Sequence, residues 1–166
     1  FQIEDILQMV KTMKEPNVLP QDVVEKYGKA SSGSIDNRVE DSQLVLLSYK
    51  LTGRKGVVNM HLRSTGGGME LSMVSADFLQ NAEASITKTV DDYRSLIPKS
   101  DREGMEVKQA IEELGMPKTI YAFKPVKGEV DSISLSYSTT DNMTVSLFFY
   151  EVNGLYRLKS MMTSTV

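Results

Sequence analysis

The side chains that could perform acid–base or metal chemistry are few in this chain. Its 166 residues include one histidine, His61, and no cysteine. A catalytic histidine needs a nucleophile and an orienting carboxylate beside it, and the sequence has no G-x-S-x-G nucleophile motif. A metal site needs several ligands, and His61 has no cysteine or second histidine to join it. We therefore expect a protein that is not an enzyme and that uses no catalytic residue, no metal and no cofactor.

Two other patterns contain residue types that occur in catalytic or phosphate-binding sites, but their spacing does not indicate such a site. Adjacent carboxylates fall within segments of helical spacing, where neighbours point about 100° apart and do not face each other as an acid pair. These pairs are Glu4/Asp5, Asp91/Asp92 and Glu112/Glu113. The glycine run STGGG at 64–68 lacks the lysine and the following helix of a phosphate-binding loop. The carboxylates predict solvated helix faces, and the glycines predict a turn between strands.

Two segments with strict alternation are more informative. The apolar residues of 58–62 and of 145–149 leave a second set of side chains on the opposite face of each strand. That face should be wet, and the alternating serines of 132–138 should share it. Aromatic residues on an open sheet face are candidates for contact with a partner, unless a loop or the other half of the chain covers them. The candidate partner-binding face is Asn59, His61, Arg63, Ser146, Phe148 and Tyr150.

Helices and strands in a definite order must position these residues. Helical spacing of apolar residues occurs at 1–13, 21–27, 85–97 and 105–114, and Gly28 and Gly115 end the second and fourth of these helices. Strand patterns occur at 43–51, 55–63, 69–76, 118–126, 130–138, 143–152 and 154–162. The polar segment 31–37 predicts a loop.

The order of elements indicates an internal duplication. VVEKYGKAS at 23–31 aligns with AIEELGMPK at 110–118, and the tripeptide LSY occurs at 47–49 and again at 135–137. We therefore predict a first repeat at 1–79, with a helix, a short helix and three to four strands. A second repeat at 80–166 has a helix, a short helix and four strands. The expected fold is α+β, with two tandem helix–helix–antiparallel-sheet repeats and the helices packed on one sheet face.

Two segments carry a family resemblance. ELGMP at 113–117 is followed by four expected strands, and KYGKA at 26–30 occupies the matching place in the first half, without the proline. This organisation resembles the beta-lactamase inhibitor protein fold and the small outer-membrane assembly lipoproteins of the same superfamily. Those inhibitors have disulfides, which this chain lacks, and no inhibitory loop motif occurs here. The resemblance implies a binding module on an exported protein.

The composition and net charge limit the classes of partner that we expect this protein to bind. The net charge of −3 gives no basic surface for nucleic acid, and no stretch approaches the roughly 18 apolar residues of a membrane span. The chain begins at Phe1 and not at methionine, so we expect an exported, periplasmic or cell-envelope protein, attached to a membrane only if a lipid anchor precedes this chain. We expect a bacterial, non-catalytic module that binds a protein partner. The alternative is a carrier of small molecules or lipids of the cystatin-like or NTF2-like type.

Overall fold

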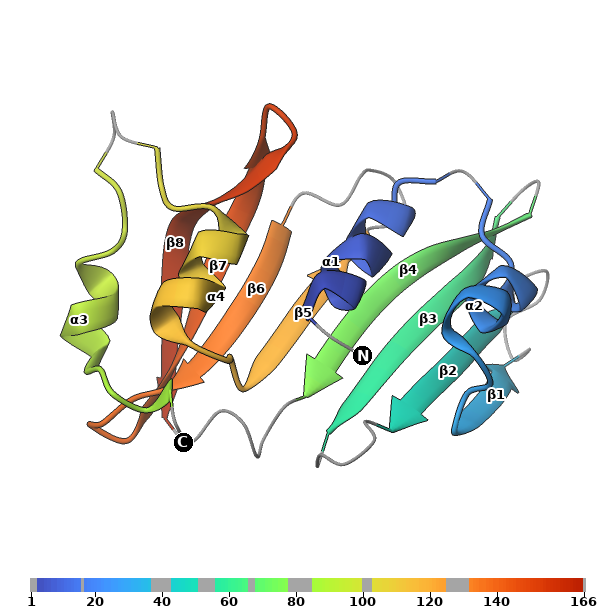
Figure 1. Cartoon of the computed structure of the whole chain (residues 1–166), viewed down its shortest axis with the longest axis horizontal. Coiled ribbons are helices and arrows are strands. Elements are labelled where there is room, and N and C mark those ends of the chain that lie inside the picture. The colour runs from blue at the N-terminus through green and yellow to red at the C-terminus, as the bar shows by residue number, and fades with distance from the viewer. Residues whose placement is uncertain are drawn as a thin grey trace. The chain divides into compact units, whose positions relative to one another are not determined.

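The computed structural model describes residues 3–15, 17–36, 43–50, 56–65, 68–77, 85–99, 103–124 and 132–165. Its helices are α1 (Ile3–Thr12), α2 (Pro20–Tyr27), α3 (Val90–Arg94) and α4 (Val107–Leu114). Its strands are β1 (Ser32–Asp36), β2 (Leu44–Lys50), β3 (Val57–Thr65), β4 (Gly68–Asp77), β5 (Thr119–Phe123), β6 (Ser132–Ser138), β7 (Met143–Val152) and β8 (Leu155–Thr165). These strands follow one another in sequence order within one sheet, from β1 at one edge to β8 at the other (Figure 1).

This arrangement corrects the expected fold. We predicted an α+β chain of two tandem helix–helix–antiparallel-sheet repeats with the helices packed on one sheet face, and that prediction is wrong. The strands of both halves belong to one eight-stranded sheet, and the helices are short, from 5 residues in α3 to 10 in α1. Continuous strand pairing is favoured because two separate sheets would leave twice as many edges with unpaired backbone groups.

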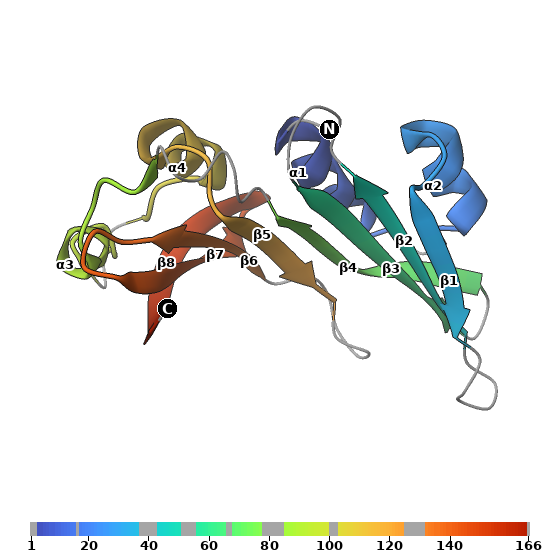
Figure 2. The ribbon, with the colours of Figure 1, turned by 90° about the horizontal axis from the view of Figure 1, so that it is seen from below.

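The chain also divides into two compact units. Unit 1 consists of Phe1–Ala76 and Ala122–Val130, and unit 2 consists of Asp77–Tyr121 and Asp131–Val166. In unit 2, α3 contacts β7 and α4 contacts β8. Figure 2 shows α4 on one side of these strands, so their other face is turned away from the helix. The division into repeats at 1–79 and 80–166, and the duplication that it expresses, stay predictions.

Two elements differ from their expected form. The segment expected to be a loop at 31–37 contains β1, which pairs with β2 and has no other partner among the described strands. An edge strand keeps one row of backbone groups in water, so its polar sequence needs no buried face. The helix expected over 85–97 is shorter and comprises only α3. It begins after Thr89, because the Thr89 side chain caps it by accepting a hydrogen bond from the Asp92 backbone N–H at 3.2 Å.

The strand pairs β2–β3 and β6–β7 are built on the same inner pattern. In each pair, the inward side chains of the two strands lie opposite one another and are buried. The opposed inner pairs are Val45–Leu62, Leu47–Met60 and Tyr49–Val58 in the first, and Ile133–Phe149, Leu135–Leu147 and Tyr137–Val145 in the second. These apolar pairs form the centre of the core of each unit.

On each inner face, a tyrosine forms a hydrogen bond to the glycine that ends a helix. The Tyr49 hydroxyl donates to the Gly28 carbonyl at 2.8 Å, and the Tyr137 hydroxyl donates to the Gly115 carbonyl at 2.9 Å. Gly28 follows α2 and Gly115 follows α4, with φ of 84° and 85°. Because positive φ favours glycine, and because the last carbonyls of a helix need donors, each tyrosine–glycine contact fixes a helix end to a strand.

Candidate partner-binding face

The outer face of unit 2 is the face of β5–β8 opposite the buried side chains. On β7, Phe148 and Tyr150 alternate with the buried Leu147 and Phe149, and both aromatic rings are only half-buried. Phe148 lies opposite Ser134, and Tyr150 opposite Ser132. The serines of β6 therefore line the aromatic pair on the same face, as the alternation predicts.

Two apolar residues that we did not single out from the sequence also belong to this face. Tyr121 lies between the buried Ile120 and Ala122 on β5 and is 43% exposed. Met162 on β8 lies opposite Ser146 and is 66% exposed. Alternation within TIYAF would have identified Tyr121. Met162 required the register of β8, which the sequence does not fix. We define the outer patch of unit 2 as Tyr121, Phe148, Tyr150 and Met162.

Two cations of β8 lie beside this patch: Arg157 is opposite Tyr150 and pairs with Glu103, and Lys159 lies over the Tyr150 ring. The pairing of β7 and β8 is irregular between Phe148 and Phe149, so that Lys159 falls outside the strand register. Its ammonium nitrogen lies 5.4 Å from the centre of the Tyr150 ring. Such a cation–π contact holds an exposed lysine next to an aromatic face. The contact places a positive charge beside the apolar and hydroxyl groups of this face.

The other half of the candidate face, on β3 in unit 1, is polar and internally bonded. Asn59 accepts a hydrogen bond from the Ser48 hydroxyl at 2.6 Å, and the His61 carbonyl accepts one from Ser72 at 3.1 Å. The His61 side chain is half-buried, and this burial lowers the pKa of its imidazole. The residues of β3 and those of β7 lie in different units, and each set occupies one face of its own strand.

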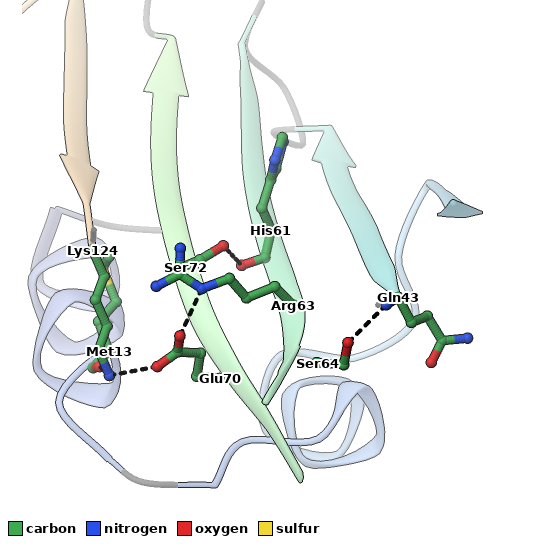
Figure 3. A network of polar contacts seen from close by, with 8 residues as sticks. All are labelled: Met13, Gln43, His61, Arg63, Ser64, Glu70, Ser72 and Lys124. Atoms are coloured by element: carbon green, nitrogen blue, oxygen red, sulfur yellow. Dashed lines mark hydrogen bonds and ion pairs between the residues drawn. The ribbon is translucent and has the colours of Figure 1, made fainter. Parts of the chain in front are cut away.

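Arg63 belongs to a buried ion cluster, which Figure 3 shows together with the His61 ring pointing away from it. Its Nε lies 2.6 Å from Glu70 Oε1, and Lys124 Nζ lies 2.8 Å from Glu70 Oε2. Lys124 also donates to the Met13 carbonyl at 3.0 Å. Sequence spacing gave no indication of this cluster, because its members come from β3, β4 and the end of β5. Arg63 is therefore committed to an internal contact.

The two cations of this cluster change the pKa of the Glu70 carboxyl. Burial alone would raise its pKa, but hydrogen bonds from Lys124 and Arg63 outweigh burial and lower the pKa below its ordinary value. The three side chains are 13–18% exposed. One carboxylate is shared by two poorly exposed cations, so its removal would be costly to the fold, and the cluster leaves little for a partner to bind.

Unit 1 also has an apolar groove between the start of α2 and the strands β1 and β2. Its volume is about 720 Å³, within the range of ligand pockets. Its lining is mostly apolar, with two polar residues, Ser34 and Gln43, and Ile35 beside it is 62% exposed. The other lining residues are Pro20, Gly33, Val45, Leu47 and Met69.

The chain matches none of the protein-family models, curated proteins or solved structures with which it was compared. The resemblance to the beta-lactamase inhibitor protein family and the expected exported location therefore stay predictions. No described helix has the length and apolar character needed to cross a membrane. Within the described ranges, no group of three or more acidic or histidine side chains is placed to hold a metal ion.

Proposed function

We propose that this protein is a non-catalytic binding module that contacts a protein partner through the outer patch of unit 2. One observation carries the proposal: aromatic and thioether side chains occupy the sheet face that points away from the core. Tyr121 and Met162 are 43% and 66% exposed there. Exposed apolar groups gathered on one face mark interaction sites more often than scattered ones do.

The chemistry of the patch favours a protein over a small ligand. Tyrosine and methionine are enriched at the centres of protein interfaces, and methionine adapts its shape to a partner surface. The serines of β6 offer hydrogen bonds beside the rings, and Lys159 supplies one positive charge. We expect the partner to present an apolar centre with acidic or hydroxyl groups around it.

Quantitative affinity purification tests this function. The bait is the intact protein, and its recovered partners are compared with those of a Phe148→Ala/Tyr150→Ala double variant. Ile35→Ala is the matched control, because it removes another exposed apolar side chain, but from unit 1. A partner lost with the double variant and retained with the control supports the proposal, provided that the purified partner then binds the wild type directly. Equal recovery by all three proteins would exclude this face.

A second candidate function is carriage of an apolar small molecule or lipid, which the groove in unit 1 favours. A substitution at Gly33, which lines this groove, could block it. A Cβ on Gly33 would lie 3.5 Å from Leu46 O and from a Leu47 side-chain carbon, which is ordinary contact. Because Gly33 lines the groove, the longer side chain of Gly33→Leu should project into it. Native mass spectrometry of a carrier should show a constant added mass that Gly33→Leu removes. An unchanged bare mass after supply of fatty acid would exclude the carrier function.

A further inference from the structure

One part of the β8 edge is covered by the chain itself. The Leu158 backbone N–H donates to the Met105 carbonyl at 2.9 Å, and Glu106 forms an isolated bridge with Arg157. Gly104 permits this close approach, because a Cβ there would collide with the Leu158 carbonyl oxygen. The segment before α4 therefore protects the edge of the sheet at Arg157 and Leu158.

No described segment covers the rest of the β8 edge. Residues 160–165 continue beyond the bridge and pair with β7 on one side. No described segment pairs with their other side, since β8 ends the strand order. The sequence SMMTST contains no charge and no proline, two of the devices with which proteins block an open edge. An unprotected strand edge of this kind is a template for another strand.

We propose that residues 160–164 pair, antiparallel, with the same residues of a second copy of this chain. Twofold antiparallel pairing brings one strand against itself, so a single neutral segment supplies both sides of the interface without like-charge repulsion. With the axis at Met162, each Met162 lies beside its counterpart, and Ser160 lies beside Ser164 of the other copy. On the face that carries Met162, this register places an apolar residue beside an apolar one and a hydroxyl beside a hydroxyl, and on the opposite face Met161 lies beside Thr163.

The size of this contact sets its strength. Five paired residues in each copy bury less than the roughly 1,200 Å² of a stable interface, so the dimer belongs to the weak, concentration-dependent class. Its dissociation constant should fall in the micromolar to millimolar range, about 1 µM to about 1 mM. This pairing uses the edge of β8 and needs no other protein, so its failure would leave the proposed function of the outer patch untouched.

Sedimentation velocity of the purified chain across that concentration range tests the pairing. The Ser160→Lys/Ser164→Lys variant places lysines side by side across the axis and should raise the dissociation constant about tenfold or more. Ser160→Glu/Ser164→Lys places opposite charges there and should restore or tighten the dimer. Within one chain, these two positions are four residues apart on an extended strand, too far to interact directly.

Circular dichroism establishes that both variants fold, so that a loss of dimer is not a loss of structure. A wild-type protein that is monomeric at every concentration would overturn the proposal. Equal association of the two double variants would also overturn the proposal, because residue 160 of one copy would then not lie beside residue 164 of the other.

Discussion

The strand pairs β2–β3 and β6–β7 have similar side chains on their inner faces and different side chains on their outer faces. Both inner faces are apolar, and both bring a tyrosine hydroxyl to the carbonyl of a glycine that ends a helix. On the outer face of the first pair, Arg63 is held by Glu70, and Asn59 by Ser48. On the outer face of the second, Phe148 and Tyr150 stand among serines. The inner face thus serves folding in both, whereas the second outer face has groups to offer a partner.

The outer face of β2–β3 should therefore contribute chiefly to the stability of the fold. Glu70 lies between two cations that are poorly exposed, and removing it would leave both without their carboxylate. The outer patch of unit 2 has no ion pair of comparable burial among the described residues. Substitutions in the first region should therefore lower the free energy of unfolding, and substitutions in the second should chiefly lower affinity.

The largest expected effect is that of Glu70→Ala, which should lower the free energy of unfolding by about 3 kcal/mol. This value is at the low end for a broken buried pair, because the side chains keep some exposure. Denaturant unfolding followed by circular dichroism measures it. Arg94→Ala is the control, since its partner Asp91 and Arg94 itself are 85% and 63% exposed and their contact should contribute almost nothing. Equal losses in both variants would contradict the role of the cluster.

The tyrosine–glycine contact should give the next effect. Tyr137→Phe leaves the Gly115 carbonyl without this donor and should cost about 1–2 kcal/mol. Tyr93, whose ring centre lies 5.6 Å from that of Tyr137, is the matched control. Its buried hydroxyl has no hydrogen-bond partner among the described residues, so Tyr93→Phe should be neutral or stabilising. If Tyr93→Phe is the more costly change, the account of this contact is wrong.

The two helix-ending glycines should respond differently to alanine. Both combine a positive φ with ψ of −175° and −170°, a region open essentially to glycine alone, so each change should cost at least about 1 kcal/mol through backbone strain. A Cβ on Gly28 would meet nothing within 4 Å, whereas one on Gly115 would lie 2.5 Å from the Ser85 hydroxyl oxygen. Gly115→Ala should therefore unfold at lower denaturant than Gly28→Ala. The double variant Gly115→Ala/Ser85→Ala should recover part of the difference, and equal midpoints for the single variants would contradict it.

The smallest effect is a dependence on pH. The pKa of Glu70 is lowered in the folded protein from its ordinary value of 4.5. Its contribution to stability is therefore complete above pH 4.5 and is lost as the pH falls through the lower pKa of the folded state. The stability difference between wild type and Glu70→Gln should shrink over that acidic window. A difference that stays constant from neutral pH down to acid would show that the carboxylate charge is not what matters.

The parts of the fold that the sequence predicted are those governed by local pattern. Alternation located the inner faces of β2, β3, β6 and β7, and glycine punctuation located the ends of α2 and α4. β1 was missed, because an edge strand can be polar. The joining of all strands into one sheet was also missed, because backbone pairing between distant segments leaves no periodic signal. Glu70 and Lys124 lie far apart in the sequence, so their ion pair had no spacing by which to find it.

The most direct test of the central claim is site-specific photo-crosslinking from position 121. Tyr121 is exposed on the outer patch of unit 2 and lies on β5, so a probe there reports on the face and not on the β8 edge. A benzophenone side chain at 121 should yield one dominant cross-linked partner, absent when the probe is at Ile35 and lost with Phe148→Ala/Tyr150→Ala. The same adducts from both positions, or adducts that survive the double substitution, would contradict a partner-binding role for this face.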